Sequence, residues 1–172
     1  AQTNRTDRAE QLFLKANKIQ PNNPFVNNNL GNIYYESGDY NKAIPYYEAA
    51  ISFKSDFIDP NLNLGIIYIN QEKLEKALDH LKRVIHIQPA NIRSYAIIAT
   101  IYKKQRNFKN ALDSYQKIFE IDPENLVANT GVVDLFSTLH IKNLTNNNSQ
   151  ELIEIFTFLY KKNSINHNLL FS

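Results

Sequence analysis

The sequence has no cysteine, no methionine and no tryptophan, and only four glycines among its 172 residues. Without cysteine, the chain cannot form disulfides, thiolate metal sites or a cysteine nucleophile. The four glycines are far apart and form no phosphate-binding loop, and no serine has the spacing of a nucleophile elbow. We therefore expect no catalytic activity, no cofactor and no bound metal.

Long apolar runs are also missing. No stretch approaches the roughly 20 apolar residues that cross a bilayer, and residues 1–10 contain no signal-peptide core. We expect a soluble chain without membrane insertion. Because methionine is absent, Ala1 is not expected to be the natural first residue. Either a targeting segment preceded it or the chain is a fragment, so cytoplasmic and exported locations both stay open.

The charge balance is close to neutral. Lysine and arginine number 19, and aspartate and glutamate number 17, which gives a formal net charge of +2. Binding to a phosphate backbone favours a strongly basic chain, so we expect no nucleic-acid partner. His80 and His86 are six residues apart, which is not the spacing of a helical metal site, and we expect both at the surface.

An internal repeat of 34 residues is the dominant positive feature. Residues of one kind recur in columns at this offset: Leu30, Leu64, Ile98 and Val132; Gly31, Gly65 and Ala99; Tyr34, Tyr68, Tyr102 and Phe136; Ala43, Ala77 and Ala111; Pro21, Pro89 and Pro123. Within each unit the apolar residues recur at helical spacing on either side of a short turn. The sequence therefore predicts a helix–turn–helix unit, and 58–91 is its clearest copy.

At these columns the sequence resembles the tetratricopeptide repeat family. Six residues of the clearest copy match the family's pattern: Leu64, Gly65, Tyr68, Ala77, Leu81 and Pro89. The family's tryptophan column instead holds Asn27, Asn61, Tyr95 and Asn129, and we expect this to weaken local packing. The resemblance implies an all-α fold, a right-handed superhelical solenoid of antiparallel helix pairs. It also implies a concave groove, lined by the first helices, that binds peptides or partner segments.

We predict one domain over residues 1–172, ending in a C-terminal capping helix. Its parts are the second helix of a partial repeat (9–23), three full repeats (24–57, 58–91 and 92–125), a divergent repeat with the cap (126–162) and a tail (163–172). The capping helix is expected from about Ser149 to Lys162.

Local signals refine the helix pairs. Asn23 before Pro24 and Asp59 before Pro60 are the predicted N-caps. Gly31 and Gly65 are predicted to face Ala43 and Ala77, where small residues permit close approach of two helices. Pro45 should bend its helix or delay its start.

The predicted groove residues form the stripe of each first helix that the core leaves free. They are Asn28, Asn29, Asn32 and Tyr35 in the first full repeat, Leu62, Asn63, Ile66 and Asn70 in the second, and Arg93, Lys103 and Lys104 in the third. Asparagine amides can hydrogen-bond a peptide backbone whatever its sequence, and the aliphatic residues could hold an apolar side chain. The alternative is that the asparagines reflect composition and the cations form a solvated basic face.

We predict a non-enzymatic protein–protein interaction module, a scaffold or adaptor that binds an extended peptide or partner segment. The alternative is a structural subunit that associates through its convex face or its apolar C-terminal end, including self-association through the C-terminal helix or tail. Some family members clamp the carboxylate end of a chaperone tail, and Asn32, Asn63 and Arg93 match three of those positions. Asn28 and Ile97 replace two basic residues of that clamp, so this function is the least favoured.

Overall fold

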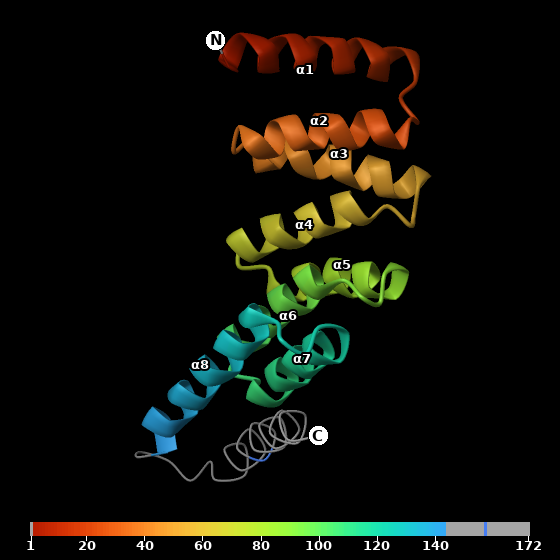
Figure 1. Cartoon of the computed structure of the whole chain (residues 1–172). Helices are drawn as coiled ribbons and strands as arrows, with labels where there is room; N and C mark the ends of the chain where they lie inside the picture. Colours follow the sequence, from red (N-terminus) through yellow and green to blue (C-terminus); the bar gives the residue numbers. More distant parts are fainter. Residues whose placement is uncertain (1, 144–156, 158–172) are drawn as a thin grey trace. The chain divides into compact units, whose positions relative to one another are not determined.

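The computed structural model describes residues 2–143 and Thr157, with side chains described over 6–138 and at Thr157. Within residues 2–143 it contains eight α-helices and no strand (Figure 1). The helices are α1 (Gln2–Ile19), α2 (Pro24–Glu36), α3 (Tyr40–Phe53), α4 (Ile58–Asn70), α5 (Leu74–Ile87), α6 (Ile92–Lys104), α7 (Phe108–Ile121) and α8 (Leu126–Asn143). No helix in the described ranges is long and apolar enough to cross a membrane. The predicted capping helix and tail lie outside the described residues.

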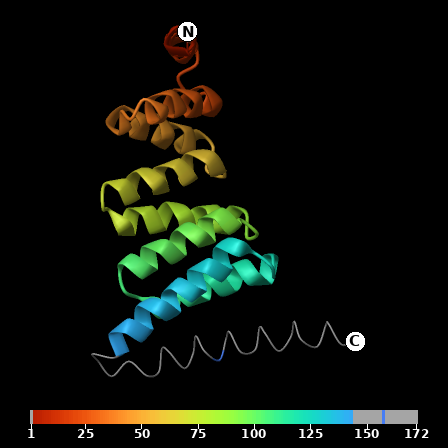
Figure 2. The same ribbon diagram turned by 60° about the vertical axis from the view of Figure 1, so that its left-hand side comes forward.

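The chain forms two compact units, Ala1–Ser94 and Tyr95–Ser172. In the first, α1 to α5 pack in chain order, with α2 on α3 and α4 on α5 as the tightest pairs (Figures 1 and 2). In the second, α7 packs on α8. The predicted all-α helical-repeat solenoid is confirmed, and the single domain over 1–172 stays a prediction.

The helix starts follow the predicted caps in α2 but not in α4. Asn23 Oδ1 accepts the backbone N–H groups of Phe25 and Val26 at 3.0 and 3.2 Å, with Pro24 as the first helical residue. In α4 the cap is Phe57, without a side-chain hydrogen bond, so the prediction of Asp59 as N-cap is wrong. Asp59 lies inside the first turn, where the helix dipole favours a carboxylate and backbone N–H groups have no helical partner.

The turn inside each full repeat contains one residue with a positive φ angle. These residues are Gly38, Glu72 and Arg106, at φ angles of 80°, 59° and 58°, and they are 34 residues apart. The residue after each one donates its backbone N–H to the preceding helix, at 2.8 to 2.9 Å. In the divergent fourth repeat α8 instead continues to Asn143, so it passes the corresponding position without this turn.

The helix pairs of the first unit close around glycines, although not with the predicted partners. A Cβ at Gly31 would meet the Tyr47 ring first, so the predicted partner Ala43 is not the nearest side chain. At Gly65 the nearest side chain is Leu81, with the Ala77 carbonyl 3.6 Å from the same point. A residue four positions further along the second helix therefore covers each glycine.

Pro45 lies inside α3, which nevertheless begins at Tyr40. The predicted delay of the helix start is therefore wrong. Asp39 explains the early start, because its carboxylate and its carbonyl accept the backbone N–H groups of Lys42 and Ala43 at 3.2 and 3.0 Å. A capped first turn can form before the missing donor of Pro45 affects the helix.

Asparagines fill the column that holds tryptophan in the family. Asn27 and Asn61 are 3% and 0% exposed. The Asn61 amide donates to the Phe57 carbonyl at 2.8 Å, and the Asn27 amide donates to the carbonyl oxygens of Pro21 and Asn23. Hydrogen bonds to nearby backbone therefore replace part of the packing that a large ring would supply.

His80 is not at the surface, contrary to the prediction. It is half-buried against the Tyr68 ring, with ring centroids 5.6 Å apart, and its Nδ1 lies 3.0 Å from Asn61 Oδ1. The Asn61 amide nitrogen already donates to the backbone, so the histidine Nδ1 carries the proton in this bond. His86, on the same helix, is exposed as predicted.

Candidate functional site

Three polar side chains from three successive helices form a closed set of hydrogen bonds. The Tyr47 hydroxyl of α3 donates to Asn32 Oδ1 of α2 at 2.8 Å. The Asn63 amide nitrogen of α4 donates to the same oxygen at 3.1 Å and to the Tyr47 hydroxyl at 3.0 Å. We call Asn32, Tyr47 and Asn63 the Asn–Tyr–Asn cluster. It joins the first helices of two neighbouring repeats through the helix between them.

The position of Tyr47 follows from the packing of α2 against α3. Its ring lies against the bare backbone of Gly31 and is fully buried, which brings the hydroxyl to the two asparagines. Burial raises the pKa of Tyr47, and the negative charges of Glu36 and Asp59 raise it further. The hydroxyl therefore stays protonated and can donate to Asn32.

The sequence prediction brought Asn32 and Asn63 together but treated Tyr47 as a core filler only. A signal for the cluster exists in the repeat columns. In the next repeat the same three columns hold Ile66, Leu81 and Ile97, so the polar residues are all replaced by apolar ones. Comparing the repeats column by column would have indicated that the three side chains interact.

The other predicted residues of the first unit differ in accessibility. Asn28 and Leu62 are buried, at 6% and 7% exposed. Asn29, Tyr35 and Ile66 are half-buried, whereas Asn70 and Arg93 are exposed. The Tyr35 ring packs on the Tyr40 ring, with centroids 5.6 Å apart. The surface that α2 and α4 offer in this unit is thus mainly amide, aromatic and aliphatic. We call Asn28, Asn29 and Asn32 on α2, with Asn63 on α4, the amide face.

In the second unit the predicted basic residues are partly neutralised. The Lys103 ammonium pairs with the carboxylate of Asp134 on α8, and this hydrogen bond raises the pKa of Lys103. Lys104 is exposed. Asp134 was not predicted, although it falls in the column of Asn32, Ile66 and Thr100. Extending the groove stripe into the fourth repeat would have found it.

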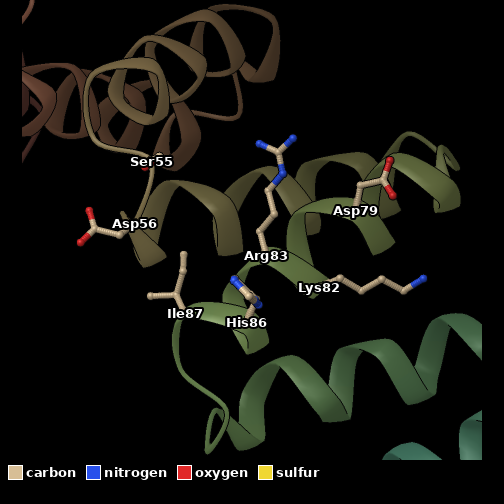
Figure 3. Close-up of a pocket in the computed structure, with 7 residues that line it drawn as sticks. All are labelled: Ser55, Asp56, Asp79, Lys82, Arg83, His86 and Ile87. Carbon is tan, nitrogen blue, oxygen red and sulfur yellow. The ribbon is translucent and has the colours of Figure 1, made fainter.

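A cleft of about 670 Å³, which the sequence did not indicate, lies between the α3–α4 turn and α5 (Figure 3). It is lined by Ser55, Asp56, Asp79, Lys82, Arg83, His86 and Ile87. Lysine and arginine side chains extend from α5 beside an aspartate of the same helix, and a second aspartate projects from the turn (Figure 3). Two carboxylates balance two permanent cations, so charge favours neither sign of ligand.

Family comparisons agree with the repeat arrangement. Tetratricopeptide repeat models match residues 12–44, 58–91 and 92–125, and a model described as a TPR repeat matches residues 31–72. Together the matches run from residue 12 to residue 125. The chain belongs to the tetratricopeptide repeat family. No curated protein matches it.

Solved structures show the same fold. MamA superposes with a TM-score of 0.75 at 19% identity, over 97% of this chain and 94% of its own. A tetratricopeptide repeat protein from Parabacteroides merdae gives 0.76 at 21% identity, over 94% of this chain and 61% of its own. The first TPR of Spaghetti (RPAP3), bound to the HSP90 peptide SRMEEVD, gives 0.62 at 18% identity, over 68% of this chain and 93% of its own.

Proposed function

We propose that this chain is a non-enzymatic interaction module that binds an extended peptide segment of a partner protein along the amide face. Proteins of this family are generally interaction modules, and the similar RPAP3 domain was solved with a peptide bound. The chain is a protein–protein interaction module at this level. The finer proposal concerns where and how it binds.

The Asn–Tyr–Asn cluster carries the proposal. Its internal hydrogen bonds use the Asn32 oxygen and the Asn63 nitrogen. The Asn32 nitrogen and the Asn63 oxygen take part in no hydrogen bond within the described part of the chain. One donor and one acceptor, held in fixed positions, match the C=O and N–H of a peptide main chain. Because the cluster is preorganised, a ligand orders few side chains on binding.

Apolar groups adjoin this donor–acceptor pair. Ile66 follows Asn63 by three residues and Tyr35 follows Asn32 by three, so each lies on the same helix face as its asparagine. Both are half-buried and leave part of their surface accessible. They would hold an apolar side chain of the peptide, while the amides bind its main chain.

The test uses the chain's own next repeat as a template. A phage-displayed library of random linear peptides is selected on the wild-type protein, and recovered peptides are measured by fluorescence anisotropy. The variant N32I/Y47L/N63I carries the residues found 34 positions later. We expect it to fold and to lose at least about tenfold in affinity, the effect of one ordinary hydrogen bond. The control K82A/R83A/H86A removes the charges on the α5 side of the cleft and should bind as wild type. Absence of an enriched peptide, or unchanged binding by the triple variant, rejects the proposal.

The exposed face of α8 favours a second candidate function, assembly through the second unit. Leu126, Val127 and Val133 are 80%, 57% and 56% exposed. Val133 stands in the column of Gly31 and Gly65, which are buried beneath the second helices of their repeats. A large apolar residue that is exposed in a core column indicates a surface that another element covers.

Light scattering on the full chain tests this candidate. Assembly predicts a mass that rises with concentration above 19.9 kDa, and a return to that mass in L126S/V133S. The control L12S changes a residue on α1 that is 59% exposed, and it should leave the mass unchanged. A wild-type mass of 19.9 kDa at every concentration rules out self-assembly through α8.

A further inference from the structure

Asn28, in the first half of α2, carries an unpaired polar atom. Its side chain is 6% exposed, and its Oδ1 is the one buried oxygen or nitrogen without a hydrogen-bond partner among the described side chains. Buried polar atoms nearly always have a partner, and an unpaired one carries a free-energy cost that a ligand group can remove. Exchanging the oxygen and nitrogen of this amide would bury an unpaired donor instead. In both orientations the position presents a neutral amide atom.

Packing does not require an asparagine here. Asn28 precedes Asn32 by four residues, so both lie on one face of α2, and Asn32 is hydrogen-bonded to Asn63 of α4. In the following repeat the same column holds Leu62, which is also buried but has no polar side-chain atom to satisfy. An apolar residue therefore fits this column, and the unpaired amide of Asn28 needs another explanation.

The two helices that carry the amide face contain no lysine or arginine. Their only charged residues are Glu36 on α2 and Asp59 on α4, both exposed. Both carboxylates raise the pKa of Tyr47, so their negative potential reaches the Asn–Tyr–Asn cluster. Among the cations outside these helices, Lys54 lies over two aromatic rings, and Arg93 is on α6. A negatively charged ligand group would find no cation on α2 or α4.

We propose that the amide face binds an internal stretch of peptide main chain and rejects a free C-terminal carboxylate, and that Asn28 determines this specificity. The inference rests on the function proposed above. An internal peptide unit brings a neutral N–H and C=O to Asn28 and satisfies its unpaired atom. A carboxylate lacks a cation for a charge-assisted hydrogen bond and meets two like charges. The partner segment is therefore neutral or basic.

The test compares two chemical forms of one ligand. A peptide selected on the wild-type protein is shortened to the segment that binds, and is made with a free C-terminal carboxylate and with a C-terminal amide. Wild type should bind the amide form at least about tenfold more tightly, the ratio expected from one hydrogen bond. The acidic peptide SRMEEVD should bind no better than its scrambled sequence.

Two variants assign the preference to Asn28. N28L carries the residue of the next repeat; it should keep the melting temperature and lose about tenfold in affinity for the amide form. N28K adds a cation and should shift the preference towards the carboxylate form. Wild type that binds the carboxylate form equally or more tightly, or N28L that binds as wild type, overturns the inference. If N32I/Y47L/N63I still loses binding in that case, the amide face remains the peptide site and only its specificity was wrong. If no peptide binds, both proposals fail.

Discussion

The Tyr47 ring lies so close to Gly31 that a Cβ on the glycine would be 2.6 Å from the ring carbons Cδ1 and Cε1. The ring cannot simply rotate away, because its hydroxyl is held between Asn32 and Asn63. The absent side chain at residue 31 and the polar cluster at the far end of the ring are therefore parts of one arrangement. A change at the glycine should disturb the amides as well as the helix pair.

The first prediction compares two glycines. Gly31→Ala should lower the free energy of unfolding by about 1–3 kcal/mol through overpacking, although alanine in a helix usually gains about 1 kcal/mol over glycine. At Gly65 a Cβ would lie 3.0 Å from Leu81 Cγ, in a flexible side chain that can shift. Gly65→Ala should therefore change stability by less than about 1 kcal/mol. Urea denaturation measures both, and equal stabilities would contradict the close packing of Tyr47.

The second prediction concerns the Tyr47 hydroxyl. Tyr47→Phe removes the donor to Asn32 and the acceptor for Asn63, and should cost about 1–3 kcal/mol because buried amide atoms lose their partners. The half-buried Tyr35 is the matched control, and Tyr35→Phe should cost less than about 0.5 kcal/mol. A cycle of Y47F with N63A should show a coupling of about 0.5–3 kcal/mol. Additive effects would mean that the cluster does not act as a unit.

The fold was predictable because the repeat offset is local information written several times. Pro24 after Asn23 specifies the start of α2 by backbone chemistry alone, and the structure follows it. The start of α4 was not predictable in this way, because Ser55, Asp56 and Asp59 can all act as caps. Packing decides there: the ring of Phe57, the residue before α4, contacts the ring of Phe25 at 5.4 Å between centroids.

The site was predictable only in outline. Helical periodicity identifies the face of a residue but not the atom that it will contact. It placed Asn32 and Asn63 on neighbouring helices, but it gave no sign that Tyr47 would use half of their hydrogen-bonding capacity. It also treated Asn28 as one more groove amide, whereas burial without a partner makes it the most distinctive residue of the face.

The third prediction uses the repeated turn. Glu72 has a φ angle of 59°, where glycine is favoured, and Gly38 occupies the same position in the preceding repeat. Glu72→Gly should raise the free energy of unfolding by about 0.5–1 kcal/mol, since it removes the left-handed strain of a side chain. Glu72→Ala keeps that strain and should leave stability unchanged, which separates backbone from side-chain effects. Thermal denaturation measures both, and equal stability of the two variants would contradict a backbone origin.

The fourth prediction is a pH dependence from His80. Burial against Tyr68 and Asn61 lowers its pKa in the folded chain, and the charges of Arg83 and Lys76 lower it further, partly opposed by Asp79. The unfolded chain therefore binds a proton at higher pH than the folded chain does. Stability from the neutral ring is present above about pH 6.5, the ordinary histidine pKa, and is lost as the pH falls below it. Between about pH 7.5 and about pH 5.5, H80Q should show a flatter fall in unfolding free energy than wild type. H86Q, changed at the exposed histidine of the same helix, should keep the wild-type slope. Equal slopes for H80Q and wild type would show that His80 does not set this dependence.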